Sequence, residues 1–206
     1  MLVKRTTAIL ALALVAALWQ APAGLSESVE TMPVAIKLPA PDTSGGRPLM
    51  AALNDRRSER SFGPAALSDQ QTAEILWAAV GVNRPEDGNR RTSPTAMNRQ
   101  DVEVYALTAK GAFHYNALKH ELEYIKVNDQ SGLLGAPLGL VFTAPADSAA
   151  AGINVGFCSQ NVYLYAASEG LNSIVKITVD REALAKVLDL GEDRQIVAVQ
   201  LIGPKP

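Results

Sequence analysis

The stretch GFCSQNVYLYAASEGL, residues 156–171, is the part of this chain that decides the fold class. Small and apolar side chains fill most of its positions, so a helix here would present no broad polar face. Gly170 then provides an ordinary helix end. The stretch therefore predicts a helix from about residue 157 to residue 169 that is packed on both sides. A plain buried helix and a helix in a dimer core both agree with this pattern.

A second helix is indicated upstream by a capping box. Ser68 and Gln71 are spaced so that each side chain can satisfy a free backbone amide of the first turn. An apolar stripe follows over residues 72–80, and Gly81 ends it. A third helix is expected to start with Asp180 as its N-cap residue. That helix would bury Leu184, Val187 and Leu188.

Four segments rich in β-branched or aromatic residues are expected to form strands, at residues 102–108, 113–115, 138–143 and 196–202. Parts of the last two, residues 141–143 and 196–201, are apolar enough for central strands. Because helical and strand-like segments alternate from Arg47 onward, the sequence predicts one mixed α and β domain over residues 47–206. Neither a glycine-rich dinucleotide motif after a strand nor a Walker loop is present, which argues against Rossmann and P-loop sites.

The first residues have the order that is typical of a secretory signal peptide. Lys4 and Arg5 are followed by an apolar run over residues 8–19 and by the small-x-small sequence APA, which ends at Ala23. The run is too short to span a bilayer comfortably. We therefore expect cleavage of residues 1–23 and an exported protein, periplasmic or secreted, without a stable membrane anchor; a buried N-terminal helix is the alternative.

Residues 24–46 contain several prolines and glycines and show no helical period, so they are predicted to be a linker or an extended arm. The net charge of the chain is −2, and the predicted signal peptide carries two cations and no carboxylate. A mildly acidic surface offers no general attraction for nucleic acid.

Cys158 is the only cysteine, which excludes a disulfide within one chain. We expect it to be a buried small hydrophobic residue rather than a nucleophile. His114 and His120 have no cysteine nearby and are poorly spaced for zinc, so no metal site is expected.

The sequence RRSER, residues 56–60, is a candidate phosphate site. Arginine offers a fork of donors and keeps its charge, so three arginines and one hydroxyl can surround a phosphate. The nearby Leu53 and Phe62 indicate that the run is a helix end packed against the core, and on a helix Arg56 and Arg60 would share one face. A solvated charged surface is the alternative.

The sequence RTSPTAMN, residues 91–98, combines small hydroxyl side chains, a proline and an amide. Such a loop can present donors and acceptors to a planar heterocycle without bulk. An ordinary surface loop is the alternative.

Taken together, these motifs resemble the nitroreductase superfamily, and most closely its small branch similar to the SagB-type dehydrogenases. Members of that branch typically contain R-R-S-x-R-x-F, a helix that ends L-W-A-A-x-G-x-N-R, then R-T-x-P-S-A-x-N, and later G-F-x-x-Q-N-V-Y-L-x-A-A-x-E-G-L. The matching segments here are residues 56–62, 76–84, 91–98 and 156–171. FHYN and HEL, between residues 113 and 122, look like the short hairpin of the family. The resemblance covers residues 33–206.

This resemblance implies an α+β fold with a central, mostly antiparallel β-sheet flanked by helices. It also implies an intertwined homodimer with one FMN in each of two interfacial sites. Arg56, Ser58 and Arg60 match the positions that hold the FMN phosphate and ribityl chain. Arg57 matches the position that reaches the pyrimidine edge of the flavin. Lys205 matches a C-terminal basic residue that contacts the phosphate.

Two further segments match the positions around the flavin ring. Thr95 and Asn98 match a loop near the isoalloxazine that comes from the partner subunit, with Thr95 where the family usually has serine. Val175, Lys176 and Ile177 match the stretch whose backbone amides approach flavin N4 and N5. Residues 126–136 form a short stretch, which implies that the helical insert that often covers the substrate pocket is missing.

The implied function is an FMN-dependent oxidoreductase with a ping-pong cycle, in which hydride or electrons pass through flavin N5 from a small-molecule donor to a small acceptor such as a quinone or nitroaromatic compound. No side chain need act as acid or base in this scheme, so no catalytic residue is assigned. The alternatives are an exported, non-catalytic flavin-binding or interaction module with the same fold, and a purely structural secreted domain.

Overall fold

The computed structural model describes residues 34–127 and 135–206. The predicted signal peptide and the first part of the predicted linker lie outside the described residues, as does most of the short stretch at 126–136. Every helix in the described ranges is too short or too polar to cross a membrane.

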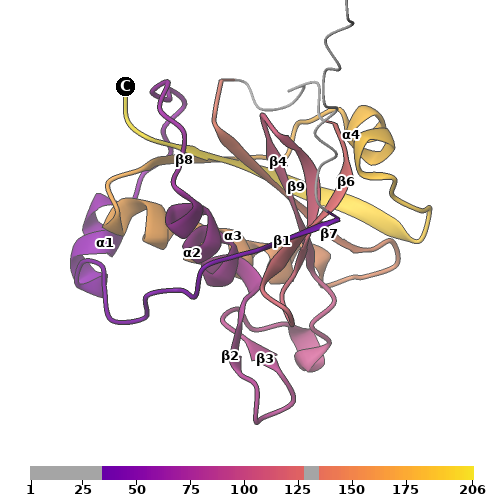
Figure 1. Cartoon of the computed structure of the whole chain (residues 1–206). Helices are drawn as coiled ribbons and strands as arrows, with labels where there is room; N and C mark the ends of the chain where they lie inside the picture. The colour runs from indigo at the N-terminus through magenta and orange to yellow at the C-terminus, as the bar shows by residue number, and fades with distance from the viewer. Residues whose placement is uncertain (1–33, 128–134) are drawn as a thin grey trace, which may run out of the picture. The chain divides into compact units, whose positions relative to one another are not determined.

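In the described part of the chain, a seven-stranded sheet forms the centre of the domain, in the order β1-β6-β5-β4-β7-β9-β8 (Figure 1). All neighbouring strands are antiparallel. The strands are β1 Ala35–Lys37, β4 Glu103–Thr108, β5 Gly111–Asn116, β6 Glu121–Lys126, β7 Leu138–Pro145, β8 Asn172–Lys176 and β9 Arg194–Gly203. β7 and β9, which contain the two segments predicted to be central, have neighbours on both sides. The predicted α+β class with a mostly antiparallel sheet is confirmed.

The described ranges contain four α-helices: α1 Leu49–Asp55, α2 Asp69–Val80, α3 Ala151–Ser168 and α4 Arg181–Leu188. The capping box of α2 is confirmed, because Ser68 Oγ accepts the Gln71 N–H and the Gln71 side chain accepts the Ser68 N–H. Asp180 caps α4 by accepting the Ala183 N–H. Helix α3 begins at Ala151, earlier than the predicted residue 157. The start was not predicted because no capping side chain marks it.

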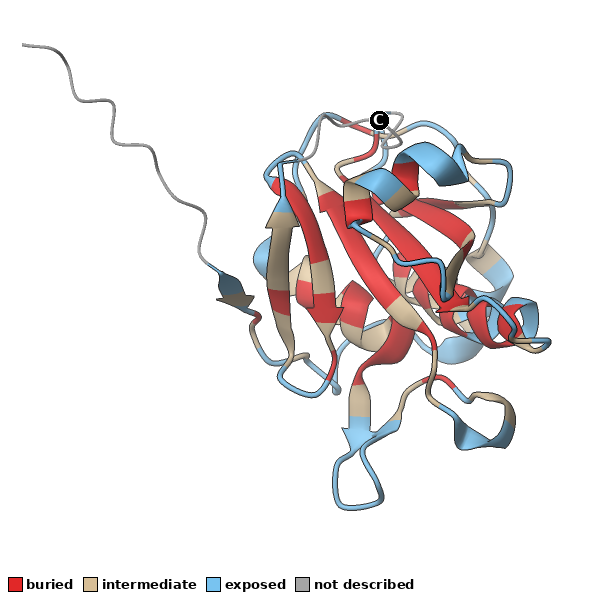
Figure 2. Cartoon of the chain, turned by 90° about the vertical axis from the view of Figure 1, so that its right-hand side faces the viewer, coloured by how far each residue is buried: buried red, intermediate tan, exposed pale blue. Residues whose placement is uncertain are grey.

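The two faces of the sheet carry separate apolar clusters. Val104 and Ala106 of β4 face α2 and α3, whereas Tyr105 and Leu107 of the same strand pack in the cluster that contains α4. This alternation follows from the two-residue period of a strand. Figure 2 shows the buried residues concentrated in the strands and on the inner sides of the helices.

Smaller elements complete the fold. A hairpin of β2 Val82–Arg84 and β3 Arg90–Arg91 is followed by a short 3-10 helix, η1 Ala96–Asn98. Within the predicted linker or arm, residues 35–37 form β1, which pairs with β6 at one edge of the sheet.

The prediction of a helix end at residues 56–60 is wrong. Helix α1 stops at Asp55, and Arg56 has φ −58° and ψ 123°, which is extended backbone. The backbone of this run bonds to the sheet instead, because the Glu59 N–H donates to the carbonyl oxygen of Ser173 in β8 at 2.9 Å. Arg56 and Arg60 are therefore not related by one helical turn.

Candidate functional site

The arginine run, residues 56–60, lies along the outer edge of β8. Because side chains of an extended backbone alternate in direction, the run contributes to two cavities. Arg57 and Glu59 line one cavity of about 320 Å³, which we call the Lys205 cavity. Arg60 and Phe62 line another of about 330 Å³, the Lys176 cavity.

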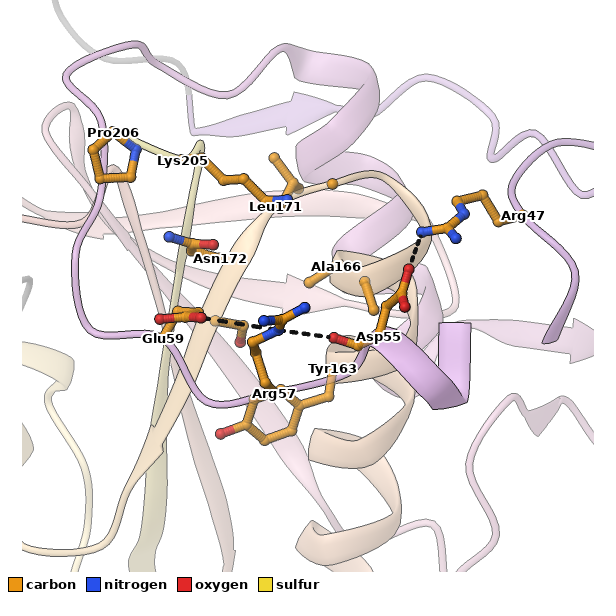
Figure 3. Close-up of a pocket in the computed structure, with 13 residues that line it drawn as sticks. Arg47, Asp55, Arg57, Glu59, Tyr163, Ala166, Leu171, Asn172, Lys205 and Pro206 are labelled. Atoms are coloured by element: carbon orange, nitrogen blue, oxygen red, sulfur yellow. Dashed lines mark hydrogen bonds and ion pairs between the residues drawn. The ribbon is translucent and has the colours of Figure 1, made fainter. Parts of the chain in front are cut away.

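The Lys205 cavity mixes charges of both signs (Figure 3). Arg47 pairs with Asp55 at 2.7 Å, and this hydrogen bond holds the pKa of Asp55 below its usual value. Arg57 Nε donates to the Asp55 carbonyl oxygen at 3.3 Å and lies 3.9 Å from Glu59 Oε1. Both carboxylates of the cavity therefore already have cationic partners.

Strand β8 leads from one cavity to the other. Asn172 and Ser173 line the Lys205 cavity, and residues 174–178 line the Lys176 cavity. The three residues predicted for the flavin N4–N5 region, Val175, Lys176 and Ile177, are thus all in the second cavity. The Val175 N–H, however, donates to the Tyr163 hydroxyl at 2.8 Å, so this amide is already engaged within the protein.

Four basic residues at this edge have no acidic partner. Within residues 34–127 and 135–206, no carboxylate oxygen lies within 4.0 Å of the charged groups of Arg56, Arg60, Lys176 or Lys205. Ser58 adds a hydroxyl to the same edge. Guanidinium, ammonium and hydroxyl groups that have no carboxylate partner of their own are donors suited to phosphate.

Thr95 and Asn98 are not brought to these cavities within one chain. Thr95 Oγ1 accepts the Gln100 N–H, and the adjacent Ala96 N–H donates to Asn154 near the start of α3. Tyr163, which lines the Lys205 cavity, is about 13 Å further along that helix at 1.5 Å per residue. The structure therefore separates this predicted loop from the arginine run of the same chain.

Tyr163 and Asn172 also line the Lys205 cavity, and neither was predicted from the sequence to belong to the site. Asn172 is buried and donates to the Ser61 carbonyl oxygen at 2.8 Å, which fixes the end of the arginine run. Tyr163 lies on α3, for which the sequence predicted only a helix packed on both sides. Its hydroxyl within a stretch of small and apolar side chains is the signal that could have identified it.

Cys158 is fully buried, and its thiol donates to Ser93 Oγ at 3.3 Å. Burial raises the pKa of this thiol to about 11, so the prediction of an inert buried cysteine agrees with its surroundings.

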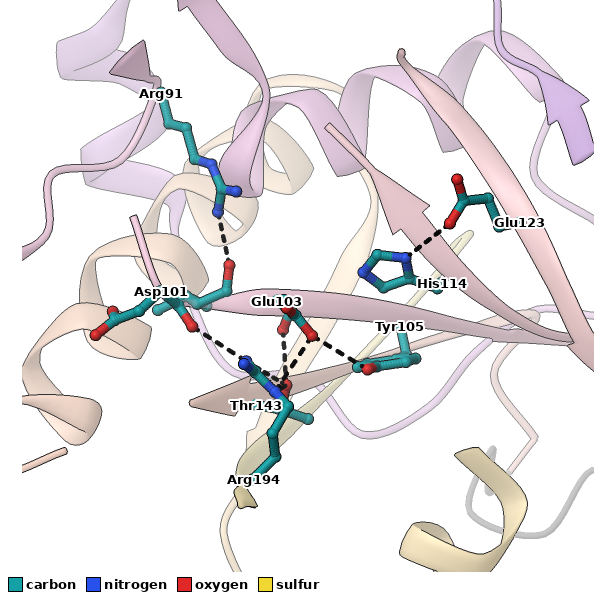
Figure 4. A network of polar contacts seen from close by, with 9 residues as sticks. Arg91, Asp101, Glu103, Tyr105, His114, Glu123, Thr143 and Arg194 are labelled. Atoms are coloured by element: carbon teal, nitrogen blue, oxygen red, sulfur yellow. Dashed lines mark hydrogen bonds and ion pairs between the residues drawn. The ribbon is translucent and has the colours of Figure 1, made fainter. Parts of the chain in front are cut away.

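The two histidines have protein partners. His114 pairs with Glu123 at 3.1 Å, close to a network in which Arg194 contacts Glu103 and Thr143 (Figure 4). His120 contacts the Tyr115 hydroxyl and the carbonyl oxygen of Pro39. The described ranges contain no group of three or more acidic, histidine or cysteine side chains arranged for a metal ion.

An antiparallel sheet covered by helices, with a phosphate-type donor set at one edge, defines an α+β domain suited to a phosphate-bearing ligand. The chain belongs to the nitroreductase family, which it matches over residues 53–203. The predicted superfamily is thereby confirmed, and the family indicates a flavin oxidoreductase in general.

Solved structures agree with this assignment. A protein from Ralstonia eutropha JMP134 described as a nitroreductase is 34% identical, with a TM-score of 0.80, over 86% of this chain and 92% of that one. An FMN-dependent nitroreductase from Clostridium difficile R20291 shares the fold at 16% identity and a TM-score of 0.54, over 77% and 90% of the two chains. A chain of the E. coli microcin synthetase McbBCD complex shares the fold at 21% identity and a TM-score of 0.61, over 75% of this chain and 73% of that one. No curated protein sequence matches the chain at a significant level.

Proposed function

We propose that this protein is an FMN-dependent oxidoreductase of the SagB-type dehydrogenase-like branch. The observation that carries the proposal is a set of four basic residues near β8, namely Arg56, Arg60, Lys176 and Lys205, that have no acidic partner among the described residues. A phosphate monoester carries between one and two negative charges near neutral pH, and such a group would neutralise this excess. The FMN-dependent relative from Clostridium difficile supports the same cofactor.

The order of the two cavities suggests how FMN would lie. Arg56, Arg57, Ser58 and Lys205 would hold the phosphate and ribityl chain at the Lys205 cavity. Arg60 shares its cavity with residues 174–178, so we assign Arg60, rather than Arg57, to the pyrimidine edge. When bound, FMN would supply hydride and electron transfer, and the protein would supply binding and orientation.

We propose a ping-pong cycle, in which the small-molecule donor and acceptor would use the same site in turn. The absorption spectrum of the purified protein tests the proposal most directly, since bound FMN is yellow and is released on denaturation. Turnover with a reductant and a quinone or nitroaromatic acceptor then separates an enzyme from a non-catalytic flavin-binding module. Colourless protein that binds no added FMN would refute both.

We further propose a homodimer, because apolar side chains remain exposed near the start of α3 and in η1. Ile153 and Phe157 lie one turn apart on α3 and are 64% and 42% exposed, and Met97 beside Asn98 is 85% exposed. A partner subunit would cover such side chains and would bring its own Thr95 and Asn98 towards the site. Light scattering should give a dimer mass at micromolar concentration, and a monomer mass would contradict the proposal.

The signal-like order of residues 1–23 supports a further proposal, export of the protein. Mass spectrometry of protein from its native host should then find an N-terminus at or near Gly24. An intact Met1 on protein purified from the cytoplasm would argue against it.

A further inference from the structure

Tyr163 on α3 contacts three separate groups of the proposed flavin site. Its hydroxyl oxygen lies 2.9 Å from Ser58 Oγ and accepts the Val175 N–H at 2.8 Å. Its ring centroid lies 5.4 Å from the guanidinium carbon of Arg56. One side chain of a helix therefore links the arginine run to β8.

One of the two hydrogen-bond directions at this hydroxyl is fixed by its partner. A backbone N–H can only donate, so the Tyr163 oxygen accepts from Val175, and the phenol proton needs an acceptor of its own. Among the described residues, the other hydrogen-bond contact of this hydroxyl is with Ser58 Oγ. In the arrangement in which Tyr163 donates to Ser58, the proton of Ser58 is available to donate to a ligand.

A serine held in this way suits an anionic oxygen. Its hydroxyl proton would form a charge-assisted hydrogen bond with a phosphate, which is stronger than a bond between neutral groups. The cation–π contact favours a position of the Arg56 guanidinium above the same ring, beside that serine. Both groups would then act on one phosphate.

We propose that Tyr163 is a positioning residue for the FMN phosphate, which it serves by making Ser58 a donor and by orienting Arg56. This inference rests on the proposed function, because it assumes FMN as the ligand. It predicts that the tyrosine hydroxyl matters for FMN and not for riboflavin, which lacks the phosphate.

The test is a double-mutant cycle in which FMN and riboflavin are titrated into wild type, Tyr163→Phe, Ser58→Ala and the double variant. Tyr163→Phe should weaken FMN binding about tenfold, the effect of one net hydrogen bond, and change riboflavin binding less than about twofold. In the Ser58→Ala background the same substitution should have almost no effect on FMN, because the two residues act as one unit. The ³¹P NMR signal of bound FMN should also move in Tyr163→Phe.

Tyr165→Phe is the matched control. It removes a hydroxyl from the same helix, but that hydroxyl donates to Glu74 at 2.6 Å, and Tyr165 does not line either cavity of the site. The ratio of FMN to riboflavin affinity should stay at the wild-type value. Equal losses for both flavins in Tyr163→Phe, or an undiminished loss in the Ser58→Ala background, would overturn the inference and leave Tyr163 with a packing role. Wild-type protein that bound neither flavin would overturn the proposed function together with this inference.

Discussion

Replacing Arg56 by alanine should weaken FMN binding by roughly tenfold to a hundredfold. Arg56 is half-buried, has no carboxylate partner among the described residues and lies over the Tyr163 ring. A charge-assisted hydrogen bond contributes about 1.5–3 kcal/mol. This range corresponds to about one to two orders of magnitude in affinity. Because the side chain is partly exposed and its charge is partly screened, we expect the loss to lie towards the lower end of that range.

The assay is a flavin-fluorescence titration of wild type, Arg56→Ala and Arg90→Ala with FMN and with riboflavin. Arg90→Ala is the matched control, since it removes the same charge from the β2–β3 hairpin, where Arg90 pairs with Asp87 at 3.1 Å. Only Arg56→Ala should lose FMN affinity, and neither variant should bind riboflavin much more weakly than wild type does. Equal FMN affinity in all three proteins would show that the arginine run is a solvated surface and that the site assignment is wrong.

Three further outcomes are expected. Ser68→Ala should lower the free energy of unfolding by about 1 kcal/mol in urea denaturation, because it removes the N-cap of α2; an unchanged midpoint would contradict this role. Burial lowers the pKa of His120, so the unfolded chain binds its proton first as the pH falls; stability should decrease from about pH 7 downward, more steeply in wild type than in His120→Asn. If the stabilities of wild type and His120→Asn fell equally with pH, His120 would not be the source of this pH dependence. Cys158 should resist thiol reagents in the folded protein and react in denaturant, and rapid labelling of the folded protein would contradict its burial.

Local signals made part of the fold predictable. The capping box at Ser68 and the N-cap at Asp180 each involve residues within one turn, so their spacing alone indicates a helix start. The apolar segments of β7 and β9 were also predictable as strands, because a strand inside a sheet with both faces covered is apolar along most of its length. The strands β1, β2, β3 and β8 and residues 123–126 of β6 were not predicted, since they are short and owe their position to partners elsewhere in the chain.

The sequence indicated which residues are candidates for the site, but not how they are arranged. The residues of the arginine run were identified, yet their extended conformation depends on Ser173, which is far along the chain. Tyr163 was missed for the same reason, because its role follows from contacts with Ser58 and Val175 rather than from its neighbours in sequence. The separation of Thr95 from the site within one chain is also a tertiary feature, and it leaves this part of the prediction to be tested with the assembled protein.

The position of the arginine run at the border of the sheet has a consequence for aggregation. A strand at a sheet border offers unpaired N–H and C=O groups on which a foreign strand can assemble. Two such groups of β8 are occupied here, the Ser173 carbonyl by Glu59 and the Val175 amide by Tyr163. Substitutions that detach this run from β8 would therefore expose an edge for intermolecular β-pairing. A single substitution in the arginine run can then lower both the solubility of the protein and its affinity for ligand.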